Sequence, residues 1–229
     1  MDTENKILKT LRANADAVYK DFNASLIPNI SHDLFIGVRT PILRKIAKDM
    51  VKSGEYNDFI SKIPHKYFEE NQLHAFILSN ISDFDVVVRL IDLFLPYVDN
   101  WATCDQMSPT TFKTHKDILI KYVCKWIKSK HPYTVRFGVK VLMQYWLDDD
   151  FDEKYADMVA DIKSNEYYIN MMRAWYFATA TAKQYERILP YLKTGRLDEW
   201  TRLHAIQKAI ESYRVSNEHK KELRLLKWE

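Results

Sequence analysis

The chain has 229 residues, of which 47% are hydrophobic and 14% aromatic, and its formal net charge is +3 at pH 7. This length and composition fit one compact domain or one array of repeats. Only 4 residues are glycine, which disfavours a hairpin-rich barrel and a nucleotide-binding α/β sheet, because tight turns and phosphate loops depend on glycine. The small positive charge permits nucleic acid as a partner without requiring it.

Several function classes lack their sequence signals. Cys104 and Cys124 are too few for a disulfide framework and do not form a CxxC pair, so we expect a reducing cytoplasm. No signal-peptide pattern or long uncharged apolar segment occurs, so we expect neither export nor a membrane span. The 7 histidines are scattered, without HExxH or Cys/His spacing, so no metal site is expected. GxSxG, Walker and GxGxxG motifs are absent, which argues against such hydrolases, NTPases and dehydrogenases.

Helices are predicted from the start of the chain. Apolar residues at helical spacing predict a first helix from Asp2 to Phe22. Pro28 stops it, because proline cannot continue a helix. A second helix is predicted to begin with Thr40 as its N-cap and Pro41 in the first helical position, and to end at Gly54.

The rest of the chain continues in the same pattern. Further helices are predicted near residues 66–79, 84–95, 110–128, 133–147, 152–163, 167–182, 184–192, 199–213 and 216–227. No strand is predicted, because sustained alternation with Asn-Gly or Asp-Gly turns is missing. Antiparallel helix pairs repeated at roughly 35 to 45 residues are typical of HEAT-like arrays, which curve and present a concave face. The expected fold class is therefore all-α, with residues 1–229 forming a single-domain α-solenoid of HEAT-like helix pairs.

Basic side chains recur at helical spacing on two neighbouring predicted helices. Lys121, Lys125 and Lys128 lie on the first, and Arg136 and Lys140 lie on the second. Two such ridges would suit a phosphate backbone, because lysine and arginine contacts to phosphates dominate nucleic-acid affinity. The alternative is a solvated face that binds nothing.

The segment NWATCDQMSP places an aromatic ring, Trp101, four residues before a carboxylate, Asp105. On a helix the two side chains would share one face. Because an unpaired carboxylate is costly to bury, Asp105 is either a site residue or a helix cap or surface-turn residue. A second tryptophan, Trp175, lies in a segment that is apolar on nearly every side, so periodicity predicts that it is a core residue, as it does for Trp101.

Several segments of the chain, taken together and in their order along it, resemble the AlkD-type DNA alkylation repair proteins, which are HEAT-like-repeat DNA glycosylases. The resemblance runs from GVRTPILRKIAK through NWATCD to the helix that ends in AIQKAIESYR. The family pattern Trp-x-x-x-Asp is met by Trp101 and Asp105. The second tryptophan of the family, eight residues after an aromatic pair begins, is met by Trp175, and an arginine on the intervening helix is met by Arg136.

The resemblance implies removal of cationic alkylated purines, such as 3-methyladenine and 7-methylguanine, from duplex DNA by hydrolysis of the N-glycosidic bond. Asp105 would stabilise an oxocarbenium-like sugar and help to position water, while Trp101 and Trp175 would cradle the cationic nucleotide. The implied partner is duplex DNA with alkylated bases, bound by a monomer with no cofactor, metal or membrane. The candidate DNA-contacting residues are Arg136, Lys140, Arg39, Lys121 and Lys125.

The sequence departs from the family pattern at three positions. Asn100 stands where an aromatic residue often precedes the first tryptophan, Ala178 where a basic residue follows the second, and Arg39 where some relatives have a polar amide. Absence of a ring and of a phosphate-binding cation would weaken DNA capture. One alternative is a catalytically inactive HEAT-like scaffold for structured nucleic acid or a protein partner, with both indoles buried. Another is a purely structural helical domain in which Asp105 only caps a helix.

Overall fold

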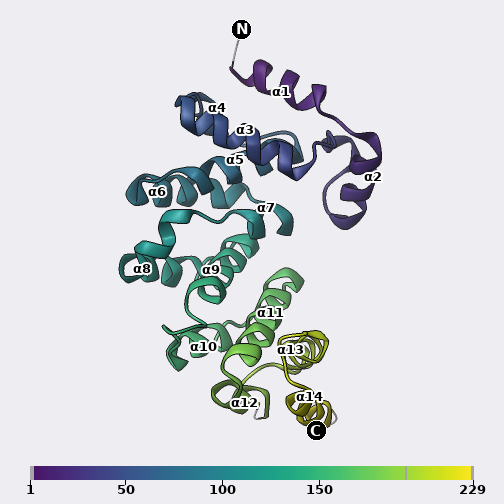
Figure 1. Ribbon diagram of the computed structural model, residues 1–229, viewed down its shortest axis with the longest axis vertical. Coiled ribbons are helices and arrows are strands. Elements are labelled where there is room, and N and C mark those ends of the chain that lie inside the picture. The colour runs from purple at the N-terminus through teal and green to yellow at the C-terminus, as the bar shows by residue number, and fades with distance from the viewer. Residues whose placement is uncertain (1–2, 194, 228–229) are drawn as a thin grey trace. The chain divides into compact units, whose positions relative to one another are not determined.

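The computed structural model describes residues 3–193 and 195–227. Over these residues the chain forms fourteen α-helices and three short 3-10 helices (Figure 1). The described part of the chain contains no β-strand, and its one isolated β-bridge joins Ala15 to Val38. The all-α prediction is confirmed for this part of the chain.

Contacts divide the chain into two compact units, residues 1–115 and 116–229. In the first unit, α5 packs against α3, α6 and α7. All α5 residues from Phe68 to Ser79 are buried, so this helix is the centre of the unit. The elements of the first unit are α1 (Thr3–Ala13), α2 (Ala17–Leu26), η1 (His32–Leu34), α3 (Thr40–Ser53), α4 (Asn57–Ser61), α5 (Phe68–Asn80), α6 (Phe84–Phe94), η2 (Leu95–Tyr97), α7 (Trp101–Gln106) and η3 (Thr110–Thr114).

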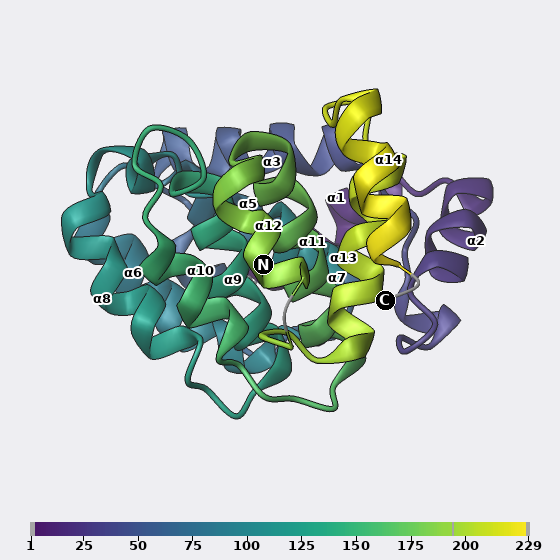
Figure 2. The ribbon, with the colours of Figure 1, turned by 90° about the horizontal axis from the view of Figure 1, so that it is seen from below.

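The second unit is built around α11, which packs against α9, α10, α12 and α13. Figures 1 and 2 both show α11 and α13 side by side. The helices of this unit are α8 (Lys116–Trp126), α9 (Pro132–Tyr145), α10 (Glu153–Ala160), α11 (Tyr167–Lys183), α12 (Tyr185–Lys193), α13 (Glu199–Glu211) and α14 (Asn217–Leu226).

The prediction of one helix from Asp2 to Phe22 is wrong within the described residues; Asp2 itself lies outside them. The chain forms α1 and α2 instead, with Asp16 as the N-cap of α2. The Asp16 carboxylate accepts the N–H of Tyr19 at 3.0 Å, and the Asp16 N–H donates to the carbonyl of Gly37 at 3.0 Å. These bonds take Asp16 out of helical geometry, although the apolar spacing continues through it.

Smaller differences concern helix ends. The predicted helix over 110–128 is a 3-10 helix followed by α8, and α4 has no counterpart among the predicted helices. The N-cap of α3 is Arg39 rather than Thr40, which is the first helical residue. The predicted end at Gly54 is confirmed, since this glycine adopts φ +75°, a left-handed conformation that favours a residue without Cβ.

Two histidines make a polar contact inside the first unit. Nε2 of His65 lies 2.8 Å from Nδ1 of His74. The His65 ring stacks on Phe59 and the His74 ring on Phe94, with centroid distances of 4.5 and 3.9 Å. Burial disfavours the charged imidazoles, so it lowers the pKa of His65 to about 4 and the pKa of His74 well below its ordinary value.

Acidification is therefore expected to destabilise the protein. Because both histidines have a folded-state pKa below the ordinary 6.5, the unfolded state binds more protons between about pH 6.5 and about pH 4. In that window the free energy of unfolding decreases as the pH is lowered, by up to about 1.4 kcal/mol per pH unit for each histidine. Denaturant unfolding at pH 7, 6, 5 and 4.5 measures the slope. A His65→Leu, His74→Leu double variant should have a shallower slope, and an unchanged slope would assign it to other groups.

Candidate functional site

The helix α7 carries Trp101 and Asp105. Its N-cap is the buried Asn100, whose Oδ1 accepts the N–H of Thr103 at 2.8 Å. Asn100 therefore has a capping role that an aromatic side chain at this position cannot fill. The partly buried Trp101 donates its Nε1–H to the carbonyl of Leu26 at 3.2 Å. Its ring packs against a core cluster of Ile27, Phe35, Phe68 and Ala102.

Asp105 is a residue of the last turn of α7, and the N-cap of this helix is Asn100. A carboxylate near the C-terminal end faces the negative pole of the helix dipole, so the dipole does not favour aspartate at this position. Beside it, the exposed Arg44 on α3 donates to Oε1 of Gln106 at 3.2 Å and lies over the Phe76 ring at 4.2 Å. The exposed Arg44 guanidinium is therefore bonded to Gln106, the residue that follows Asp105. Sequence reasoning did not assign Arg44 to the site.

Arg39 precedes α3 and is held by an ion pair. Its Nε and one of its terminal N–H groups donate to Oδ2 of Asp16 at 3.0 and 2.7 Å, and the guanidinium lies 5.1 Å from the centre of the Tyr19 ring. The N–H of Tyr19 and then the Arg39 guanidinium lower the pKa of Asp16. Because Asp16 already balances its charge, Arg39 would contact a phosphate only in competition with this carboxylate.

The loop before Arg39 is fixed by hydrogen bonds to the buried carboxylate of Glu69. Glu69 accepts the N–H groups of Ile36, Gly37 and Val38 at 2.8, 2.7 and 3.3 Å. Burial raises the pKa of Glu69, and these N–H groups act against that shift. Gly37 has φ +97°, and a Cβ there would lie 2.4 Å from the carbonyl oxygen of Asp16. Only glycine fits this position without distortion, and the loop places Arg39 accurately as a result.

The two predicted basic ridges differ in exposure. Lys121 and Lys125 are exposed on α8, whose buried residues are Leu119, Val123 and Trp126. On α9, by contrast, the side chains of Arg136 and Lys140 are only 5% and 6% exposed. The solvated-face alternative is therefore wrong for these two residues.

The surroundings of α9 explain why its cations are buried. This helix packs against both α8 and α11 in the second unit. Arg136 donates from Nη1 to the carbonyl of Tyr168 on α11 at 2.8 Å, and Nζ of Lys140 lies 5.4 Å from the centre of the Phe137 ring. The spacing in the sequence predicts that the two cations share one face of the helix, but it does not predict that their side chains are buried. Their contact with DNA stays a prediction.

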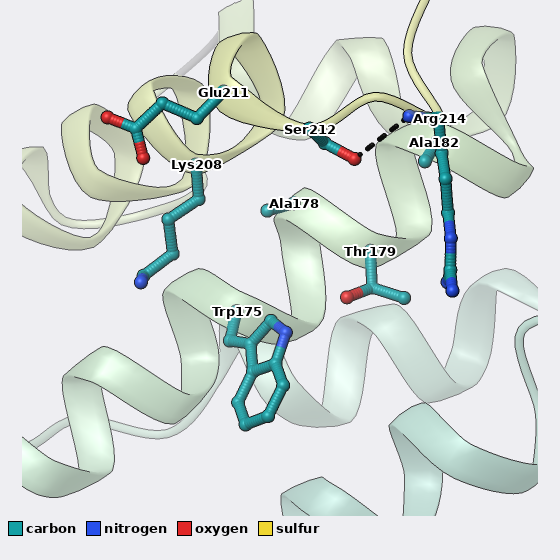
Figure 3. Close-up of a pocket in the computed structure, with 8 residues that line it drawn as sticks. All are labelled: Trp175, Ala178, Thr179, Ala182, Lys208, Glu211, Ser212 and Arg214. Carbon is teal, nitrogen blue, oxygen red and sulfur yellow. Dashed lines mark hydrogen bonds between the residues drawn. The ribbon is translucent and has the colours of Figure 1, made fainter.

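Trp175 is 42% exposed on α11, so the prediction that it is a core residue is wrong. The residues one and two turns further along the same face are Ala178, Thr179 and Ala182, whose side chains are too short to cover an indole. They line a pocket of about 420 Å³ together with Trp175, Lys208 and Arg214 (Figure 3). Burial of both indoles would have supported the scaffold alternative, and the exposed Trp175 does not provide that support.

Lys208 and Arg214 are two further candidates, besides Arg44, that the sequence did not indicate. They come from the end of α13 and the segment after it, and no local spacing links them to Trp175. Within the described ranges, no group of three or more His, Cys, Asp or Glu side chains could hold a metal ion. None of the helices described is both long and apolar enough to cross a membrane.

Over the described residues, these features define an all-α protein with an exposed tryptophan in a pocket lined by two cations and one carboxylate, and with a tryptophan–aspartate pair on a separate short helix. A family model described as DNA alkylation repair enzyme matches residues 7–211. The chain belongs to this family, and the resemblance to the AlkD-type proteins is confirmed. No curated protein sequence matches the chain. Family membership connects the chain with enzymes of alkylated-DNA repair and with DNA as the molecule bound.

Proposed function

We propose that the protein is a DNA glycosylase that removes cationic alkylated purines of the 3-methyladenine and 7-methylguanine type from duplex DNA. In this proposal its helices form an α-solenoid of HEAT-like pairs with a concave DNA-binding face, and it acts as a monomer in the cytoplasm. The observation that carries the proposal is the exposed Trp175 indole in a pocket with two cations, in a chain that matches the alkylation repair family over residues 7–211.

The chemistry needs little beyond charge stabilisation, because a positively charged base is already a good leaving group. The bond between C1′ and the base nitrogen breaks, and its electron pair leaves with the base, which becomes neutral. The sugar then carries the positive charge as an oxocarbenium ion until water adds to C1′ and loses a proton. The products are a free purine and an abasic site.

The proposed roles follow from these charges. The Asp105 carboxylate stabilises the cationic sugar and helps to position the attacking water. Trp101 and Trp175 attract the cationic nucleotide through the negative faces of their rings. No residue is asked to protonate the leaving base.

The cations proposed as phosphate contacts differ in kind. Lys121 and Lys125 are exposed and supply charge at the surface, where salt screens it. Arg136 and Lys140 are buried and supply fixed charge that solvent screens less. Arg39 joins them only if a phosphate displaces Asp16 from its guanidinium.

Base release from methylated duplex DNA tests the proposal. The protein is incubated with duplex treated with a methylating agent, and free bases are separated by chromatography. We expect 3-methyladenine and 7-methylguanine to appear faster than in buffer, with one abasic site for each base released, and no release from unmodified duplex. A well-folded protein that binds duplex DNA but releases no base would instead be the catalytically inactive scaffold.

A further inference from the structure

The pocket beside Trp175 contains charge that none of the roles above uses. One wall is the α11 face with Trp175, Ala178 and Thr179, and the other contains Lys208, Glu211, Ser212 and Arg214 (Figure 3). Every residue of the pocket belongs to the second unit. The small residues on α11 leave the ring face open, although the flanking Ala174 and Tyr176 are fully buried. The pocket therefore offers an aromatic surface and two cations at one place.

The two cations are available to a ligand. Among the residues that the structure describes, neither the Lys208 nor the Arg214 side chain has a hydrogen-bond or ion-pair partner. Some other cations of the same unit are paired, for example Lys183 with Asp148 and Arg187 with Glu153. Both positive charges line the same pocket and neither is paired with a described carboxylate, so a polyanion that passes through the pocket could pair with each of them.

One carboxylate, Glu211, also lines the pocket, and among the described residues it forms no ion pair with Lys208 or Arg214. Its Oε1 accepts a hydrogen bond from Nε2 of Gln207, and Figure 3 shows its side chain pointing away from Trp175, whereas Lys208 extends toward the indole. The backbone that carries Arg214 is fixed, because its N–H donates to Oγ of Ser212 at 3.2 Å. Ser212 in turn ends α13 as its C-cap. The Arg214 guanidinium is thus presented from an ordered turn on the far side of the pocket from Lys208.

We propose that Lys208 and Arg214 bind backbone phosphates of duplex DNA next to the nucleotide that lies against Trp175. The inference rests on the proposed function and extends it by assigning a phosphate-binding role to this pocket. A nucleotide strand has both features that the pocket matches, because its phosphates suit the arginine fork and the lysine charge while its sugar and base suit the ring face. A small inorganic anion would use the cations and leave the ring without a partner.

Salt-dependent duplex binding tests the proposal. Fluorescence anisotropy with an unmodified duplex gives the dissociation constant at several salt concentrations for the wild type and for Lys208→Ala, Arg214→Ala. The logarithm of the association constant decreases linearly with the logarithm of the salt concentration. The magnitude of this slope should be smaller in the variant by about 0.9 for each phosphate that it no longer binds, so by up to about 1.8, and the affinity should fall about tenfold or more. Thermal unfolding verifies the fold, and a Gln, Gln variant replaces the Ala, Ala variant if alanine destabilises the pocket.

The matched control is Lys221→Ala, Arg224→Ala on α14. These residues are also one lysine and one arginine, are exposed, belong to the same unit and do not line the pocket. Removing them changes the net charge equally, so any effect of charge alone appears in both variants. Equal slopes for the pocket variant and the control would overturn the assignment of the pocket, and base release by the wild type would then still support the proposed function. Failure of the wild type to bind duplex would overturn both.

Discussion

The Arg173→Met variant is expected to lose about 3 to 5 kcal/mol of its free energy of unfolding, because it breaks a buried charged network. Arg173 is fully buried on α11 and is the only described arginine with no exposed surface. Its guanidinium connects α11 with the end of α10 and with Asp198, the N-cap of α13. Its five acceptors are Asp198 Oδ2 at 2.7 Å, Asn170 Oδ1 at 2.9 Å, Thr201 Oγ1 at 3.1 Å, the Val159 carbonyl at 3.2 Å and the Ala160 carbonyl at 3.3 Å.

The large effect follows from what the substitution leaves behind. Methionine has nearly the right length but no donor, so the buried acceptors of Asn170, Thr201, Val159 and Ala160 lose their partner away from solvent, whereas the Asp198 carboxylate is 42% exposed. Denaturant unfolding followed by circular dichroism measures the loss. Arg187→Met is the matched control, because Arg187 pairs with Glu153 through side chains that are 43% and 47% exposed. Exposed pairs contribute less than about 1 kcal/mol, so similar losses in the two variants would contradict the role assigned to the network.

The sequence predicts most helices because their signals are local. Gly54 ends α3 through its own backbone conformation, and Asp198 caps α13 through an N–H three residues away. The prediction fails at Asp16, where the determining partners are Gly37 and Arg39, distant in sequence. Helical apolar spacing continues through that break, and yet Val18 and Phe22 are exposed. Apolar residues at helical spacing are therefore not always buried, and here the periodicity alone predicts the wrong helix.

The sequence predicts which residues belong to the candidate site, but it does not predict which of their side chains are exposed. Trp101 and Asp105 share α7, as their spacing indicates. The exposure of Trp175 depends on which small side chains adjoin it on α11 and on which helix lies opposite, and spacing alone carries neither. Arg136 is predicted on a surface ridge and is buried, because α9 packs against two other helices. Burial is a property of the packed helices, so it cannot be predicted from one helix at a time.

Asp105→Asn is expected to slow the release of 3-methyladenine and 7-methylguanine by at least about 100-fold, the effect of removing one preorganised electrostatic group from a transition state. Asparagine keeps the shape of aspartate but not the charge that would stabilise the oxocarbenium sugar. The loss should appear in the single-turnover rate constant with protein in excess over methylated duplex. Duplex affinity should stay the same or rise slightly, because a negative charge near a polyanion has been removed.

Asp99→Asn is the matched control for this effect. Asp99 is an exposed carboxylate two residues before α7, and its Oδ1 accepts a hydrogen bond from Nδ2 of Asn100 at 2.9 Å. The two substitutions remove the same charge from the same segment, but only Asp105 is assigned to the reacting sugar. Slow release with intact binding in Asp105→Asn alone would place the carboxylate's effect in the transition state rather than in DNA capture. Equal rates for the two variants would mean that Asp105 is not the electrostatic catalyst, whatever the wild type does to alkylated DNA.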